Sequence, residues 1–182
     1  GAVSGSRAHS AVLSDGSGLE PGGDTAGSAV GAQCLFLEHT EKGKEMLDPE
    51  IYPRPDGTVY VCCGFGDKEP LPASPLDVVP VAKYGPALAA LAESVSSRLA
   101  VTSQNPVVAS QACFLPDTTD GVPLIGALGS GSGAFVACGH SCWGILLGPA
   151  TGEALAELIV KGSSASSSTA DLSPFDPSRS MN

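Results

Sequence analysis

The residue types best suited to chemistry lie in the stretch 138–152. An apolar run at 134–137 leads into a turn with Gly139 and Gly144, and an amphipathic helix is predicted to follow. Such a turn leaves backbone N–H groups open at the positive end of a helix, which suits an electron-rich group on a ligand. Because glycine is the usual residue of any tight turn, an ordinary strand-to-helix connection is the alternative. Trp143, the only Trp, would contact a planar ligand in the first case and the core in the second.

The same stretch also contains residues that serve in serine hydrolases and in zinc sites. Ser141 follows His140, but the sequence GHSCWG is not the nucleophile elbow G-x-S-x-G, and adjacent residues in an extended chain point apart. A serine hydrolase is therefore disfavoured. Cys138, His140 and Cys142 share a face in an extended chain, but a fourth zinc ligand is not evident. We name no metal ligand.

Two further motifs precede this stretch. In the sequence PRPDGTVYV, Asp56-Gly57 predicts a hairpin turn. Arg54 beside this turn could pair with a substrate carboxylate, and Tyr52 or Tyr60 could line a pocket; a solvated turn residue is the alternative for Arg54. The sequence DTTDGVPLIG at 117–126 predicts a turn followed by an apolar strand and carries no functional signal of its own.

The elements that position these motifs follow from apolar periodicity and turn residues. We expect strands over 8–13, 32–39, 58–63, 106–115, 123–128 and 134–138. Helices are predicted from Pro86 to about residue 98 and over 152–160, with Gly162 ending the second. The last strand, 134–138, is expected in the interior of a parallel sheet whose other strands are missing from this sequence, so in this chain alone it would expose an apolar edge. Residues 14–31 are predicted to form a flexible Gly/Ser-rich loop, and 163–182 a Ser-rich tail, disordered unless Leu172 and Phe175 dock.

Composition narrows the class of protein. The hydrophobic share of 42% in 182 residues permits a folded core, whereas the formal charge of −10 disfavours nucleic acid as a partner. The sequence has no run of eighteen apolar residues, so no membrane span is expected. Six cysteines without a CxxC pair are interpreted as reduced, which favours a cytoplasmic location.

The motifs, in this order, resemble the C-terminal half of the FAD-dependent D-amino-acid-oxidase-like oxidoreductases. The sequence DGVPLIG at 120–126 resembles the family's DGxPLIG element. The sequences GHSCWG at 139–144 and GPATG at 148–152 resemble its GHxxxG…GPxTG element. The sequence EIYPRPDG at 50–57 is similar to that of a plant and fungal branch of the family. The resemblance spans residues 32–162.

The resemblance implies a fold of class α+β / α/β. Residues 1–112 would form part of a mixed-sheet substrate domain, and 113–162 the C-terminal strand–helix segment of a Rossmann-like FAD-binding domain. The family's N-terminal G-x-G-x-x-G half is missing from this sequence and would be a partner segment of the same protein. The sequence GALGSG at 126–131 does not replace it, since its spacing is wrong and no helix is predicted after it.

The resemblance also implies a cofactor, FAD, and a reaction, hydride transfer to flavin from a C–H next to an amine nitrogen of a small-molecule substrate. No side-chain acid or base is required, so no catalytic residue is named. The implied cofactor-binding residues are Gly139, His140, Ser141, Cys142, Trp143, Gly144, Ile145 and Cys113. The implied substrate-binding residues are Tyr52, Arg54 and Leu115.

Two departures from the family pattern bear on these roles. Relatives that oxidise amino acids often carry Arg at the position of Leu115, so a free amino acid is disfavoured as substrate unless Arg54 substitutes. Cys113 falls where some relatives attach flavin covalently, and a buried structural cysteine is the alternative. These departures leave a second hypothesis open, a non-catalytic flavoprotein-fold scaffold linked to intracellular trafficking.

Overall fold

The computed structural model describes residues 2–14, 33–40, 43, 45–68, 70–129, 131–162 and 170–180. The chain divides into two compact units. We call Arg7–Asp67 with Pro72–Cys113 the N-terminal unit, and Phe114–Asn182 with Gly1–Ser6 and Lys68–Leu71 the C-terminal unit. The predicted loop 14–31 lies outside the described residues, except for Ser14, which ends the first strand.

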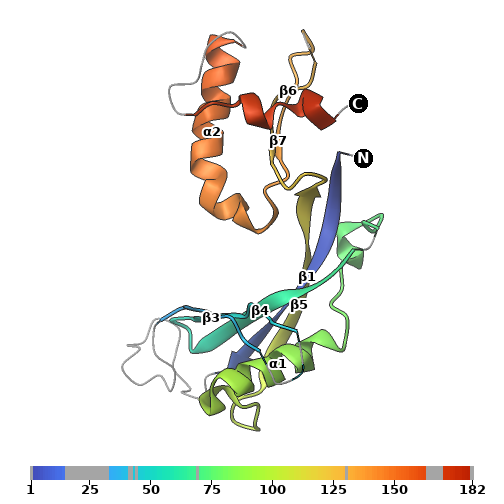
Figure 1. Ribbon diagram of the computed structural model, residues 1–182. Helices are drawn as coiled ribbons and strands as arrows, with labels where there is room; N and C mark the ends of the chain where they lie inside the picture. Colours follow the sequence, from blue (N-terminus) through green and yellow to red (C-terminus); the bar gives the residue numbers. More distant parts are fainter. Residues whose placement is uncertain are drawn as a thin grey trace. The chain divides into compact units, whose positions relative to one another are not determined.

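A five-stranded sheet is the main β-structure (Figure 1). Its order is β2-β3-β4-β1-β5, formed by β1 (Val3–Ser14), β2 (Leu35–Phe36), β3 (Glu50–Pro53), β4 (Thr58–Lys68) and β5 (Val107–Thr118). The predicted hairpin at Asp56-Gly57 is confirmed, since β3 and β4 pair antiparallel with Tyr52 opposite Tyr60. The Asp56 carboxylate closes this turn by accepting a hydrogen bond of 3.0 Å from the Thr58 N–H.

The core of the N-terminal unit forms between this sheet and helix α1 (Tyr84–Val95). Alternate residues of β4, Val59 and Val61, are fully buried, and Leu88 and Ala92 are buried from α1. The predicted helix is therefore confirmed, but it ends at Val95 because the Ser96 side chain begins a separate 3-10 turn, η3 (Ser97–Leu99). Another 3-10 turn, η2 (Pro75–Asp77), precedes the helix.

The predicted strand 32–39 is shorter than expected. Only Leu35 and Phe36 form β2, while residue 32 lies outside the described residues. Leu37 N–H donates to the Pro49 carbonyl at 3.1 Å, but proline has no N–H to donate back, so the ladder is interrupted there. An isolated bridge between His39 and Leu47 follows.

The C-terminal unit contains a β-hairpin, a helix and a folded tail. Strands β6 (Leu124–Ala127) and β7 (Phe135–Cys138) pair antiparallel. They lead into a 3-10 turn, η4 (Ser141–Trp143), and helix α2 (Gly144–Lys161). The residues of β7 alternate between exposed and half-buried, and β7 pairs antiparallel with β6. Its burial by parallel strands of another segment stays a prediction.

Helix α2 begins eight residues earlier than predicted. The residues before Gly152 were interpreted as part of a glycine-rich turn, but the helix already begins at Gly144 and continues through Pro149. The predicted end is confirmed, because Gly162 has a φ of 83° and donates its N–H to the Leu158 carbonyl. By length and composition alone, Ser141–Lys161 could cross a membrane, at mean hydropathy 1.2 with 6% of the window buried. The mean hydropathy reaches this value although polar and charged residues interrupt the apolar ones in this segment.

For the tail, disorder was predicted unless Leu172 and Phe175 dock. Both side chains are half-buried, so the exception applies to residues 170–180. They form two 3-10 turns, η5 (Ser173–Phe175) and η6 (Pro177–Ser180), which lie against β6. Pro177 is fully buried and Phe175, predicted to dock, is half-buried. Residues 163–169 lie outside the described part of the chain.

Candidate flavin-binding site

The turn between β7 and α2 depends on Gly139. Its φ is +84°, a conformation that side-chain-bearing residues rarely adopt. A Cβ atom added at Gly139 would lie 2.5 Å from the Cγ2 atom of Thr118, well inside van der Waals contact. Thr118 is itself buried, and its hydroxyl donates to the Val122 carbonyl at 2.9 Å. The glycine is therefore required by packing within the C-terminal unit.

His140 connects this turn to the helix. Its Nε2 atom lies 3.1 Å from the Thr151 hydroxyl, and its carbonyl accepts the Trp143 N–H at 2.9 Å. Ser141 has a φ of +49° and is the only non-glycine residue with positive φ in the described ranges. These contacts pair the His140 ring with Thr151 rather than with Ser141, which agrees with the argument against a serine hydrolase.

Metal binding finds no support in the part of the chain that the structure describes. There, no three His, Cys, Asp or Glu side chains group closely enough to hold an ion. Cys138, His140 and Cys142 therefore do not form such a cluster, although they follow one another closely in sequence.

The 3-10 turn η4 runs directly into α2, and within it the Trp143 N–H donates to the His140 carbonyl. No side chain of the described residues caps this end of the helix. The first N–H groups of a helix have no partner within it, and they lie at the positive end of its dipole. Trp143 is 59% exposed and Ile145 is 96% exposed, so both side chains beside this end are accessible. The arrangement suits a planar ligand with a negatively charged edge. The alternative for Trp143, a place in the hydrophobic core, does not hold within this chain.

The DGVPLIG motif is held by a residue that the sequence reasoning missed. Asp120 accepts the Val122 N–H at 3.1 Å, which forms the predicted turn. Its other carboxylate oxygen pairs with Arg179 Nε at 2.9 Å. Arg179, with the backbone N–H of Val122, holds the pKa of Asp120 well below its usual value. Arg179 lies 59 residues away in the tail, so only its charge type could have suggested the pairing.

The predicted substrate-binding residues Tyr52 and Arg54 lie near each other in the N-terminal unit. The Arg54 guanidinium is 5.0 Å from the centroid of the Tyr60 ring, and the rings of Tyr52 and Tyr60 are 5.8 Å apart. Arg54 is exposed, which is also expected if it is only a solvated turn residue. The structure brings these three side chains together on β3, β4 and their hairpin turn.

Glu50 and Cys62 join this group and were missed in the sequence. The Glu50 carboxylate accepts hydrogen bonds from the Tyr52 hydroxyl and, at 3.7 Å, from the Cys62 thiol. Burial, with the Glu50 hydrogen bond, raises the pKa of Tyr52, and burial followed by the Glu50 charge raises the pKa of Cys62 to about 12. The thiol and the phenol are therefore neutral donors to one carboxylate. The period of two in a strand places Glu50 with Tyr52, and this pattern could have revealed the first contact.

Cys113 and Leu115 both lie in β5. Cys113 is exposed, so the alternative of a buried structural cysteine is wrong, while covalent attachment of flavin stays a prediction. Leu115 is half-buried. Because they are two residues apart in one strand, their side chains project from the same face.

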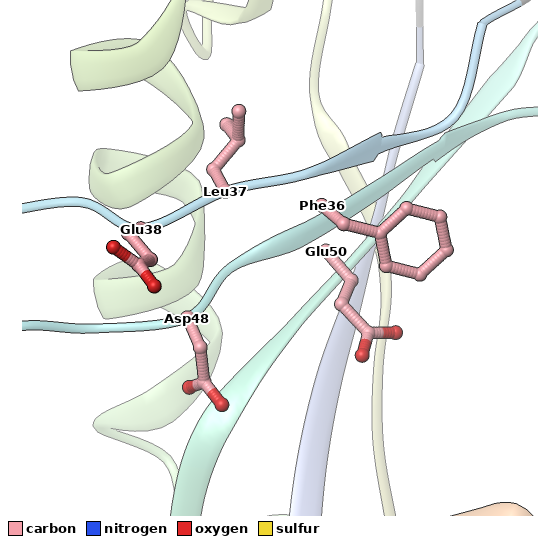
Figure 2. Close-up of a pocket in the computed structure, with 5 residues that line it drawn as sticks. All are labelled: Phe36, Leu37, Glu38, Asp48 and Glu50. Carbon is pink, nitrogen blue, oxygen red and sulfur yellow. The ribbon is translucent and has the colours of Figure 1, made fainter.

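A shallow pocket of about 240 Å³ is lined by Phe36, Leu37, Glu38, Asp48 and Glu50 (Figure 2). Three carboxylates would favour a cation, but two of them already accept hydrogen bonds. Asp48 accepts from the Cys63 thiol and the Gly64 N–H, and Glu50 accepts as described above. The pocket therefore carries no argument for a cation site.

Comparison with known proteins decides the family. Residues 18–158, well over half of the chain, match the DAO family, described as FAD dependent oxidoreductase. The chain belongs to this family. Its cofactor is FAD, and the uncapped start of α2 and the exposed Trp143 fit such a planar, electron-rich group.

Two fungal relatives are much longer than this chain. The Schizosaccharomyces pombe protein named "Putative oxidoreductase C1F5.03c" is 37% identical over 154 residues, which cover 84% of this chain and 37% of that protein. The Saccharomyces cerevisiae protein named "Putative oxidoreductase TDA3" is 36% identical over 180 residues, covering 96% and 31%. The chain therefore spans about a third of the length of these two relatives.

Glycine oxidase from Geobacillus kaustophilus is similar in both sequence and fold. It is 42% identical over 72 residues, which cover 40% of this chain and 18% of that protein. Its crystal structure matches 96% of this chain and 39% of its own, with a TM-score of 0.67 at 22% identity. The mixed sheet with helices is thus part of the family's flavoprotein fold, as expected from the sequence.

Proposed function

We propose that this chain forms part of an FAD-dependent enzyme that oxidises a C–N bond of an amine or an amino-acid-like substrate. Membership of the DAO family supports the oxidoreductase class. The 42% identity with glycine oxidase over 72 residues supports a substrate that carries an amine. None of the comparisons favours the alternative of a trafficking scaffold.

The observation that carries the proposal is the uncapped start of α2 beside an exposed Trp143. Bound FAD would supply the hydride acceptor of the reaction. The loop from Gly139 to Ile145 would hold its ring system, through backbone N–H groups and the positive end of the helix. His140, Ser141, Cys142 and Gly144 belong to this loop. The helix end would stabilise the negative charge that reduced flavin carries.

The N-terminal unit would bind the substrate. Residues 1–112 would belong to the substrate domain and 113–162 to the FAD-binding domain, as the family resemblance implies. Tyr52 and Arg54 would contact the substrate, with Arg54 as the cation for a carboxylate, since Leu115 stands where relatives carry Arg. Cys113, exposed in β5, would be the residue available for covalent attachment of the flavin.

The rest of the FAD-binding domain would come from another segment of the same protein. The chain spans 37% and 31% of the two fungal relatives. Helix α2 exposes apolar side chains, among them Ile145, Leu146 and Val160 at 96%, 71% and 84%. Burying such a surface is favourable by roughly 25 cal/mol per Å². The partner segment would cover this surface and contribute the pyrophosphate site.

The test uses the full-length protein that contains this chain. A Cβ atom at Gly144 would lie no closer than 3.7 Å to another atom, His140 Cβ, so small side chains fit there. We expect Gly144→Leu to abolish FAD retention and Gly144→Ala, the matched control, to preserve it, with equal melting temperatures of the two apoproteins. Retained FAD in Gly144→Leu would contradict the contact.

The reaction is tested separately. A panel of amines and amino acids is mixed anaerobically with the FAD-loaded protein, and loss of the oxidised flavin absorbance is followed. We expect bleaching by at least one amine. Arg54→Met should raise KM for substrates with a carboxylate and leave KM for simple amines unchanged. A flavin that no amine reduces would refute the proposed reaction without affecting the assignment of the cofactor.

A further inference from the structure

The tail residue Arg179 binds several acceptors at once. Its guanidinium pairs with the Asp120 carboxylate at 2.9 Å and donates to the backbone carbonyls of Pro123 at 2.9 Å and Asp176 at 3.2 Å. It also donates to the Val122 carbonyl. A planar guanidinium with fixed donor directions holds such a set in one geometry, which a lysine ammonium does not.

A second contact fixes the same tail on β6. Gly126 has a φ of +153°, and a Cβ atom there would lie 2.9 Å from the Pro177 ring. Pro177 is fully buried. The tail is thus packed where the strand has no side chain, and Arg179 is held two residues beyond this point.

The contacts of Arg179 continue to the β7–α2 turn. The Val122 carbonyl accepts hydrogen bonds from both Arg179 and the Thr118 hydroxyl. The Thr118 methyl group fills the space beside Gly139, at 2.5 Å from the position of a Cβ atom. Gly139 is the first residue of the proposed flavin-binding loop and directly precedes His140. Three consecutive contacts therefore connect the tail to that loop.

We infer that Arg179 is a positioning residue for the flavin: by holding residues 120–123 it sets the loop at Gly139–Ile145 through Thr118. This inference rests on the proposed function, since it requires that the loop contact the flavin. Arg179 itself acts only through other residues. Its removal leaves the Pro123 carbonyl and the Asp120 carboxylate without this donor, so the turn and the packing beside Gly139 relax.

The experiment compares Arg179→Met with Lys161→Met in the full-length protein. Lys161 is the matched control, because it is a cation of the same unit in an exposed ion pair with Glu157 at 3.2 Å. The dissociation constant of FAD from the apoprotein and the midpoint potential of the bound flavin are measured. We expect Arg179→Met to weaken FAD binding roughly two- to thirtyfold and to shift the potential, with Lys161→Met unchanged. Arg179→Lys should give an intermediate effect.

The outcomes separate this inference from the proposed function. Wild-type protein that binds no FAD would overturn both. Wild-type protein that binds FAD, with Arg179→Met unchanged in affinity and potential, would overturn the inference alone, even if the melting temperature falls. Should Arg179→Met fail to fold, Arg179→Lys and Asp120→Asn decide by the same two readouts. Unchanged affinity and potential in both would likewise overturn the inference.

Discussion

Replacement of Gly139 by Ala is expected to be costly for two reasons that the structure separates. The first is the backbone, since a φ of +84° is unfavourable for any residue with a Cβ atom. The second is contact with Thr118, whose Cγ2 atom would lie 2.5 Å from the new Cβ. Ordinary contact between carbon atoms is about 3.5–4.0 Å, so an opening of about 1 Å is needed in a buried place.

The magnitudes follow from these two contributions. A side chain in the left-handed region costs about 1–2 kcal/mol. Overpacking of a well-packed site costs about 1–3 kcal/mol. We therefore expect Gly139→Ala to lower the free energy of unfolding by about 2–5 kcal/mol.

The second contribution can be removed by Thr118→Ser. This change deletes Cγ2 but keeps the hydroxyl that donates to the Val122 carbonyl at 2.9 Å. The nearest remaining neighbours of a Cβ atom added at Gly139 would be Pro123 Cα at 3.6 Å and Leu124 N at 3.7 Å, both ordinary contacts. The double variant should thus recover the overpacking cost of about 1–3 kcal/mol and retain only the backbone cost.

The assay is a double-mutant cycle. Urea unfolding of the wild-type protein, the two single variants and the double variant is measured on the apoproteins, because bound FAD would add to apparent stability by an amount that depends on its affinity for each variant. Thr118→Ser alone should cost about 0.8 kcal/mol, the value of one buried methyl group. If the two changes are additive within about 0.5 kcal/mol, contact with Thr118 does not explain Gly139 and the reasoning is refuted.

Two further predictions concern ionisable groups. Burial and the Glu50 charge raise the pKa of Cys62 to about 12, so Glu50→Gln should speed the alkylation of Cys62 at pH 8. Because Cys62 stays half-buried, its alkylation rate should remain below that of the exposed Cys142. Peptide mass spectrometry measures both rates, and an unchanged rate for Cys62 would argue against the Glu50 contact. Because the pKa of Asp120 is lowered in the folded state, its contribution to stability is complete above its ordinary pKa of 3.8 and is lost as the pH falls below it. Arg179→Met should remove most of this acid-dependent part, so the difference between the wild-type and variant melting temperatures should narrow as the pH falls below about 4, and the part due to the backbone carbonyl contacts of Arg179 should remain.

The predictable parts of the fold were those with strong local patterns. Asp56-Gly57 between β-forming segments determined the hairpin, because its turn chemistry is local. The spacing of Leu88, Leu91 and Ala92 predicted the buried face of α1. These elements needed no knowledge of distant residues.

The misread parts depended on distant partners. The tail at 170–180 looks like a polar linker, and it folds because Pro177 and Arg179 meet β6 and the turn before it. The stretch before Gly152 was interpreted as a glycine-rich turn, whereas the helix begins at Gly144. The sequence motif was sufficient to identify the candidate site. The contacts of Thr118 and Arg179 that support it could not be predicted, because they join segments up to 59 residues apart.

The glycines of the candidate site have different explanations. Gly139 is accounted for by Thr118, so it carries no argument for a ligand. A Cβ atom at Gly144 would meet only His140 at 3.7 Å, and at Gly148 and Gly152 it would meet nothing within 4 Å. Glycine in a helix costs about 0.5–1 kcal/mol relative to alanine, and the described contacts give no compensation at these three positions. Spaced by four, they form one face on which another body can approach closely.

Position distinguishes these three glycines. Gly144 lies at the uncapped, positive end of α2, where an electron-rich group is stabilised, whereas Gly148 and Gly152 lie one and two turns further along. If FAD occupies only the helix start, a bulky side chain at Gly144 should expel it, while one at Gly152 should disturb the protein segment packed against the helix. The case for flavin at this end of α2 therefore rests on the uncapped helix start beside Trp143, where Gly144 leaves space, and not on the richness of the motif in glycine.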